Sequence, residues 1–109
     1  MSTTEFPKSE IVQLDKMVSY QPGSIVSRIM IKKPTGNLSL FAFDKGQSLS
    51  EHTAPFDAII QVLEGKAEVI IGGKSNQLSA GDTIIMPANI PHAVNATEPF
   101  KMLLTMVKE

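Results

Sequence analysis

Residues 46–65 read GQSLSEHTAPFDAIIQVLEG and residues 81–96 read GDTIIMPANIPHAVNA, and these two stretches are the most informative about the fold. Each opens with a glycine, carries one histidine, and contains short apolar runs that suit β-strands. Glu64-Gly65, Gly72-Gly73 and Ala80-Gly81 supply tight turns between those runs. The pattern therefore predicts consecutive antiparallel strands with no long helix between them.

The flanking residues extend the same pattern outward. Residues 25–32 alternate with the period of two expected of a strand, and residues 34–37 predict a turn. Residues 38–44 are apolar on both faces, which predicts a strand covered on both sides. A last strand is expected over residues 100–107. Short strands with turns at regular spacing predict an all-β sandwich or barrel of two antiparallel sheets over residues 24–107.

The remaining segments are predicted as less regular. Residues 1–8 are polar, contain Pro7, and are expected to form a flexible arm that frays or lies across the surface. Residues 9–20 suit either one or two helical turns, with Ser9 as a possible N-cap, or a short strand, ending before Pro22-Gly23. A loop is expected from Gly46 towards His52. Without a linker-like tract, residues 1–109 are predicted to form one domain.

Composition excludes several classes of function. The 109 residues carry 10 basic against 11 acidic side chains, and this balance argues against a nucleic-acid partner. No cysteine is present, so disulfides, zinc–thiolate sites and thiol nucleophiles are excluded. The N-terminus lacks the pattern of a signal peptide, and no apolar run is long enough to span a membrane. A cytoplasmic protein without membrane partners is therefore predicted.

Two sets of spaced residues resemble the motifs of the cupin superfamily. Gly46, His52 and Gly65 resemble the first motif, and Gly81, Pro87 and His92, the last two enclosing Ala88-Asn89, resemble the second. The resemblance is to small single-domain cupins of the RmlC-like type. It implies a double-stranded β-helix, or jelly-roll barrel, with a metal at the bottom of its cavity. In the family, that metal is held by two histidines spaced by one residue, a glutamate, and the histidine of the second motif.

This chain keeps half of that ligand set. His52 matches the first histidine and His92 the last, whereas Ala54 and Ala58 stand at the other two positions. Asp57 lies one residue from the glutamate position, and such an offset directs a side chain to the opposite face of a strand. Asp57 or Glu51 could complete a metal site only through a bulge of the nearby loop. Tight metal binding is therefore the less favoured interpretation.

Three functional hypotheses follow: a main one, its alternative, and a third possibility. The first is a barrel that binds a small organic molecule in its cavity, with weak or no metal dependence, through His52, His92, Phe43 and Met86. The alternative is a metal-dependent dioxygenase, isomerase or decarboxylase, in which His52 and His92 with waters and one carboxylate hold a divalent Zn, Ni, Fe or Mn ion. The third is a barrel that serves mainly as a dimerisation module.

Other residues are given less weight. Gln61 has the parity of the outer face, the single tyrosine Tyr20 is interpreted as a packing residue, and Arg28 as a solvated strand residue rather than a carboxylate clamp. The methionines in or beside predicted strands could line an adaptable apolar pocket or fill gaps in the core; they are Met30, Met86, Met102 and Met106. A homodimer is predicted, because residues 38–43 are apolar on both faces and the second face needs a cover.

Overall fold

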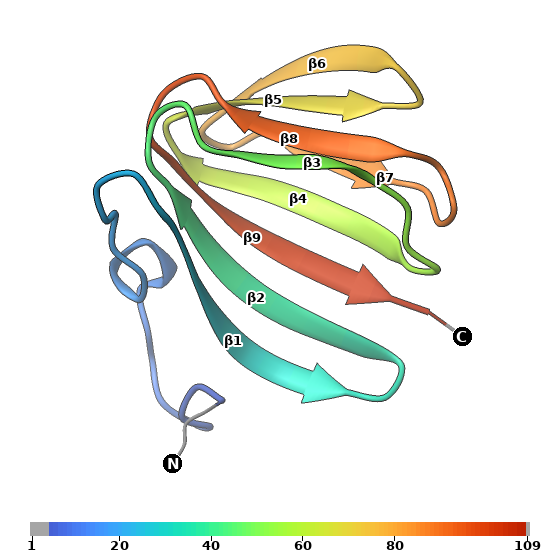
Figure 1. Ribbon diagram of the computed structural model, residues 1–109. Coiled ribbons are helices and arrows are strands. Elements are labelled where there is room, and N and C mark those ends of the chain that lie inside the picture. The colour runs from blue at the N-terminus through green and yellow to red at the C-terminus, as the bar shows by residue number, and fades with distance from the viewer. Residues whose placement is uncertain (1–4, 109) are drawn as a thin grey trace.

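The computed structural model describes residues 5–108. Within that range the chain forms one 3₁₀ helix and nine strands, with short turns between most of them (Figure 1). In chain order the elements are η1 (Leu14–Lys16), β1 (Ile25–Lys33), β2 (Gly36–Phe43), β3 (Ser48–His52), β4 (Asp57–Glu64), β5 (Lys66–Ile71), β6 (Lys74–Ser79), β7 (Thr83–Met86), β8 (His92–Ala96) and β9 (Phe100–Val107).

The strands build two antiparallel sheets that face each other. The larger has the order β1-β2-β9-β4-β7 and the smaller the order β3-β8-β5-β6. The two sheets form the walls of a barrel, with the β1–β2 hairpin at one margin of the larger sheet (Figure 1). This arrangement confirms the predicted all-β jelly roll of two antiparallel sheets. Among residues 5–108 there is no helix with the length and apolar character needed to cross a bilayer.

The core lies between the sheets and is filled by alternate residues of each strand. The ring of Phe43 stacks on that of Phe100, its directly opposite partner across β2 and β9, with centroids 4.6 Å apart. Alternation directs one side chain in two inward, so β4 buries Ala58, Ile60 and Val62. The period of two in the sequence therefore corresponds to the alternation of buried and less buried side chains along the strand.

A second apolar cluster lies on the outer face of β2, where Leu40 and Ala42 are fully buried. The chain itself covers them with the segment that precedes β1, through the buried side chains of Phe6 and Val18. The backbone amide of Phe6 donates to the carbonyl of Met30, 3.0 Å away. The prediction that this strand is covered on both faces is correct, but an intramolecular cover removes the reason for which a homodimer was predicted.

One local prediction is wrong, and two others are wrong in part. Residues 48–52 form strand β3 rather than a loop, because they pair with β8. Residues 9–20 form one helical turn, η1, which is the helical of the two predicted alternatives, but Ser9 does not cap it because Gln13 occupies the N-cap position. Isolated short helices are marginal without packing, and here Val12, Leu14 and Met17 pack on the apolar cluster over β2. Residues 1–4 of the predicted arm lie outside the described residues, and at Phe6 the arm is packed.

Candidate functional site

Two histidines lie side by side on the smaller sheet. His52 ends β3 and His92 begins β8, and the two are direct cross-strand partners. Their ring centroids are 4.4 Å apart and their planes meet at 68°, an edge-to-face arrangement. His92 is buried at 6% exposure, whereas His52 is exposed. The pair therefore runs from the surface into the barrel, with His52 at the rim and His92 below it.

Backbone carbonyls hold both rings in the same tautomer. The Nδ1 atom of His52 lies 2.7 Å from the carbonyl oxygen of Ser50, and that of His92 lies 3.1 Å from the carbonyl oxygen of Ile90. A carbonyl oxygen only accepts hydrogen bonds, so each Nδ1 carries the donated hydrogen. In the neutral ring the other nitrogen, Nε2, then keeps a free lone pair. Both histidines can thus accept a hydrogen bond or ligate a metal through Nε2.

The histidines line a small cavity between the sheets, with a volume of about 50 Å³. Apart from them, the described lining residues are all apolar and come from both sheets and from the segment after β3. They are Leu49, Ala54, Ala58, Ile60, Met86, Val94, Met102, Leu104 and Met106. The site is therefore a mainly apolar pocket whose polar side chains, the two histidines, come from the smaller sheet alone.

The predicted site residues are only partly brought together. His52, His92 and Met86 line the cavity. Phe43 faces the same interior but lies against Phe100, at the end of β9 opposite to the cavity, where it is fully buried and packs the core. Met102 and Met106, noted in the sequence only as candidate pocket methionines, belong to the lining. Their spacing along one strand with Leu104 between them is the signal that places all three on one face.

The other metal-ligand positions of the family are occupied by methyl groups. Ala54 and Ala58 both line the cavity. Asp57 is directed elsewhere: its Oδ1 accepts a hydrogen bond from the backbone amide of Ala88, at 2.9 Å. Glu51 is exposed. Within the described range, 5–108, no group of three or more His, Cys, Asp or Glu side chains could hold a metal ion. The residues present thus do not make up the family's metal site.

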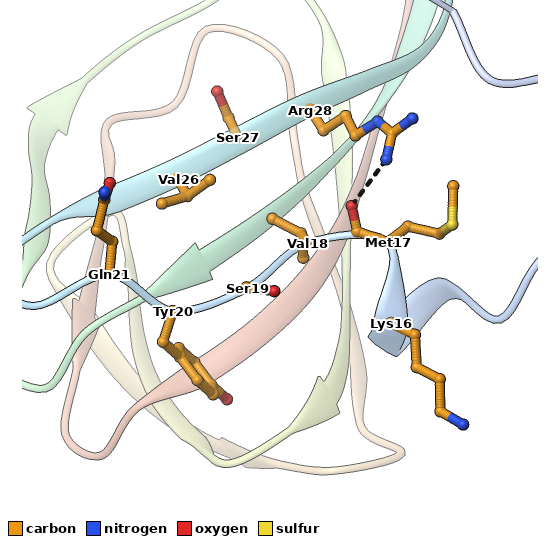
Figure 2. A pocket seen from close by; sticks show the side chains of 9 residues that line it. All are labelled: Lys16, Met17, Val18, Ser19, Tyr20, Gln21, Val26, Ser27 and Arg28. Carbon is orange, nitrogen blue, oxygen red and sulfur yellow. Dashed lines mark hydrogen bonds between the residues drawn. The ribbon is translucent and has the colours of Figure 1, made fainter.

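A larger hollow of about 530 Å³ lies on the outside of the barrel, between residues 16–21 and strand β1 (Figure 2). The guanidinium of Arg28 crosses one end of it and donates to the carbonyl of Met17 at 3.2 Å (Figure 2). The same group lies 4.6 Å above the ring of Phe6. Arg28 is thus engaged in holding the N-terminal segment to the sheet. The hollow is the surface groove between residues 16–21 and strand β1.

Tyr20 fastens the same segment at a second point. Its hydroxyl donates to Oε2 of Glu64 at 2.6 Å. The buried Lys101 lies beside them: its Nζ donates to the carbonyl of Asp15 at 2.6 Å and is 3.8 Å from Oε1 of Glu64. Partial burial and, to a smaller extent, the hydrogen bond to Glu64 raise the pKa of Tyr20 well above its usual value.

Gln61 of β4 is exposed, as the parity of its position predicts.

Comparison with known proteins identifies the class. The family model described as "Cupin domain" matches residues 39–107, which is more than half of the chain. The chain therefore belongs to the cupin family, and its resemblance to small single-domain cupins is confirmed. A comparison with the curated proteins finds no match.

Three solved structures illustrate how widely the fold is shared. A conserved protein of unknown function from Streptococcus pyogenes is 34% identical, with a TM-score of 0.92 over 100% of this chain and 96% of that one. A Cupin 2 conserved barrel domain protein from Leptotrichia buccalis is 44% identical, with a TM-score of 0.84 over 86% of this chain and 46% of that one. An RmlC-like cupin from Shewanella frigidimarina is 21% identical, with a TM-score of 0.75 over 80% and 78%, and shares the fold alone.

Proposed function

We propose that this cupin binds a small, uncharged and mainly apolar molecule in its barrel cavity, without dependence on a divalent metal. The observation that carries the proposal is the lining itself, in which methyl, thioether and alkyl groups surround two imidazoles. Such a pocket recognises a ligand by apolar contact and fixes its orientation with a few polar groups. Because the described lining residues include no Lys or Arg, a carboxylate or phosphate would enter uncompensated.

The tautomer of the histidines narrows the class of ligand. Each Nδ1 already donates to a backbone carbonyl, so Nε2 is left as an acceptor. The matching ligand group is a hydrogen-bond donor, such as a hydroxyl or an N–H. We therefore propose small alcohols, phenols or enols as the ligand class, with their O–H at the histidine wall and their hydrocarbon part among the methionines.

The cavity must widen to admit such molecules. Its volume of about 50 Å³ is below the roughly 150 Å³ of an engineered cavity that binds benzene. Methionine side chains are unbranched and adapt to what they contact, and Met86, Met102 and Met106 supply three of them. Ligand entry beside the exposed His52 with displacement of methionines is the route that the geometry favours.

A comparison of phenol, toluene and benzoate tests this function. They share a ring but differ in having a donor, no polar group, or a negative charge. We expect phenol to raise the melting temperature more than toluene, and benzoate to have no effect, because ligand binding stabilises the folded state by mass action. Ala54→Leu fills the rim of the cavity and should abolish the phenol effect. Ala80→Leu, at an exposed position, is the matched control. Equal shifts with all three compounds would refute the proposal.

The second candidate is a metal-dependent enzyme of the dioxygenase, isomerase or decarboxylase type. One observation favours it: histidines whose Nδ1 is held by a carbonyl are typical of metal ligands. Metal content by plasma mass spectrometry, before and after chelation, with His52→Ala alongside, distinguishes the two. Near-stoichiometric divalent metal that is lost in the variant would favour the enzyme. Metal far below one per chain and unchanged stability after chelation would favour the metal-free binding barrel.

Cytoplasmic location, the homodimer and independence from nucleic acids stay predictions from the sequence. Light scattering at micromolar concentration measures the oligomeric state directly. A monomer would agree with the intramolecular cover that Phe6 and Val18 provide over β2. A dimer would have to use another surface, such as the exposed Ile85 on the edge strand β7.

A further inference from the structure

Two methionines flank the position where the cupin family has its carboxylate ligand. Ala58 of β4 is the direct partner of Met86 on β7 and also of Met106 on β9. Directly opposite residues of antiparallel strands share one face of the sheet and lie within side-chain contact. All three line the cavity, so the two thioethers lie on either side of the Ala58 methyl group. The larger sheet therefore offers sulfur where a carboxylate oxygen is missing.

The smaller sheet offers nitrogen from across the same cavity. His52 and His92 line it with their rings 4.4 Å apart, and each keeps a free lone pair on Nε2. The donors on the cavity wall are thus imidazole nitrogens and thioether sulfurs. Hard cations such as Mg²⁺ and Mn²⁺ prefer oxygen, whereas thioether and imidazole together suit copper in its lower oxidation state.

Charge supports a monovalent ion. All four donors are neutral, and the described lining holds no anion to offset a bound cation. The cost of burying an ion grows with the square of its charge, so a divalent ion is penalised far more than a monovalent one in this apolar site. A soft cation with a single charge is the metal that this donor set fits best.

We propose that the cavity binds one Cu(I) ion through Nε2 of His52 and His92 and the sulfurs of Met86 and Met106. This site keeps the two histidines that match the family's ligands but replaces the remaining ligands by thioether sulfurs and holds a monovalent ion, and it does not depend on the organic ligand proposed above. Because both occupants use the Nε2 atoms, phenol and Cu(I) should compete.

The test is an anaerobic titration of the whole chain with Cu(I), in competition with the chromogenic chelator bathocuproine disulfonate. We expect one Cu(I) per chain for the wild type. The double variant Met86→Leu/Met106→Leu should lower the affinity by about tenfold or more, because leucine keeps the volume and removes the donor. Met30→Leu, in the apolar cluster outside the barrel, is the matched control and should bind as the wild type does. Zn²⁺ in excess should not displace Cu(I).

Several results would overturn this site. These results are that the chelator keeps all Cu(I) in the presence of the wild type, that the double leucine variant binds Cu(I) as tightly as the wild type, or that Zn²⁺ displaces Cu(I). Should the double variant fail to fold, judged by its melting curve, Met106→Leu alone gives the same comparison at a partly exposed position. The phenol effect is measured on the wild type in the absence of copper, so it is a readout independent of the leucine variants. Loss of Cu(I) binding and failure of the small-molecule proposal are therefore separate outcomes.

Discussion

His52 lies directly opposite His92 in the β3–β8 ladder because a register shift separates it from Leu49. Leu49 pairs with Val94, so regular pairing would set Glu51 opposite His92 and direct His52 to the other face. The shift adds one residue on β3, and both Leu49 and His52 then line the cavity although they are three positions apart. A β-bulge therefore brings the two imidazoles together.

The two histidines should differ in their contribution to stability. His92 is buried and bonded to the carbonyl of Ile90, and His92→Ala leaves a small void and an unpaired carbonyl. We expect it to lower the free energy of unfolding by about 1–3 kcal/mol. His52→Ala at the exposed rim should cost about 0.5 kcal/mol or less. Urea denaturation measures both, and equal losses would contradict the placement of His92 below His52.

Gly65 in the β4–β5 turn and Gly73 in the β5–β6 turn allow a controlled comparison of glycine substitutions. Both have positive φ, 81° and 83°. A Cβ at Gly65 would lie 2.0 Å from the carbonyl oxygen of Pro99, whereas one at Gly73 meets nothing within 4 Å. We expect Gly73→Ala to cost about 1–2 kcal/mol, from backbone conformation alone. Gly65→Ala should cost more than about 4 kcal/mol or prevent folding. Thermal unfolding of the two variants makes the comparison, and similar losses would show that the close approach of Pro99 relaxes easily.

The strand pattern could be predicted from the sequence because alternation and turn residues are local properties. The parity of residues 58–62 correctly placed Ala58 inward and Gln61 outward. The one-residue offset of Asp57 likewise predicted that its carboxylate is directed away from the cavity, and it bonds Ala88 instead. The spacing of glycine, proline and histidine was specific enough to indicate the jelly roll.

What could not be predicted depends on contacts between distant parts of the chain. Strand β3 forms because it pairs with β8. No residue pattern within 48–52 indicates the register shift that directs His52 towards the cavity. Phe43 was placed near the site because it is apolar and faces the interior, but strand parity cannot tell the two ends of a barrel apart. The docking of Phe6 on the outer face of β2 leaves no periodic signal in the first residues.

Phe6 should anchor the N-terminal segment. It is 7% exposed and contacts the cluster over β2, whereas Ile11 of the same segment is 99% exposed. We expect Phe6→Ala to lower the free energy of unfolding by about 3 kcal/mol. Ile11→Ala should change it by no more than about 0.5 kcal/mol. Hydrogen exchange should also show faster exchange over residues 5–21 in Phe6→Ala than in the control. Equal protection in the two variants would mean that Arg28 and Tyr20 hold the segment without Phe6.

Tyr20 offers a direct measure of how firmly that segment is fastened at its other end. It is the only tyrosine, and the chain has no tryptophan, so the near-ultraviolet absorbance of tyrosinate reports this residue alone. Partial burial and the hydrogen bond to Glu64 favour the neutral phenol and raise its pKa above the usual value. In the folded protein, absorbance should therefore rise at a distinctly higher pH than in urea, where the pKa returns to about 10.

The same shift gives a pH dependence of stability with a definite sign. The unfolded chain releases the phenolic proton first, so the stabilisation linked to Tyr20 is fully present below about pH 10 and is lost as the pH rises towards the higher folded-state pKa. Tyr20→Phe removes this linkage, and the stability difference between wild type and variant should shrink as the pH rises above about 10. Because lysines titrate in the same range in both proteins, the difference isolates the tyrosine. A constant difference across that range would show that the Tyr20–Glu64 bond is not maintained in solution.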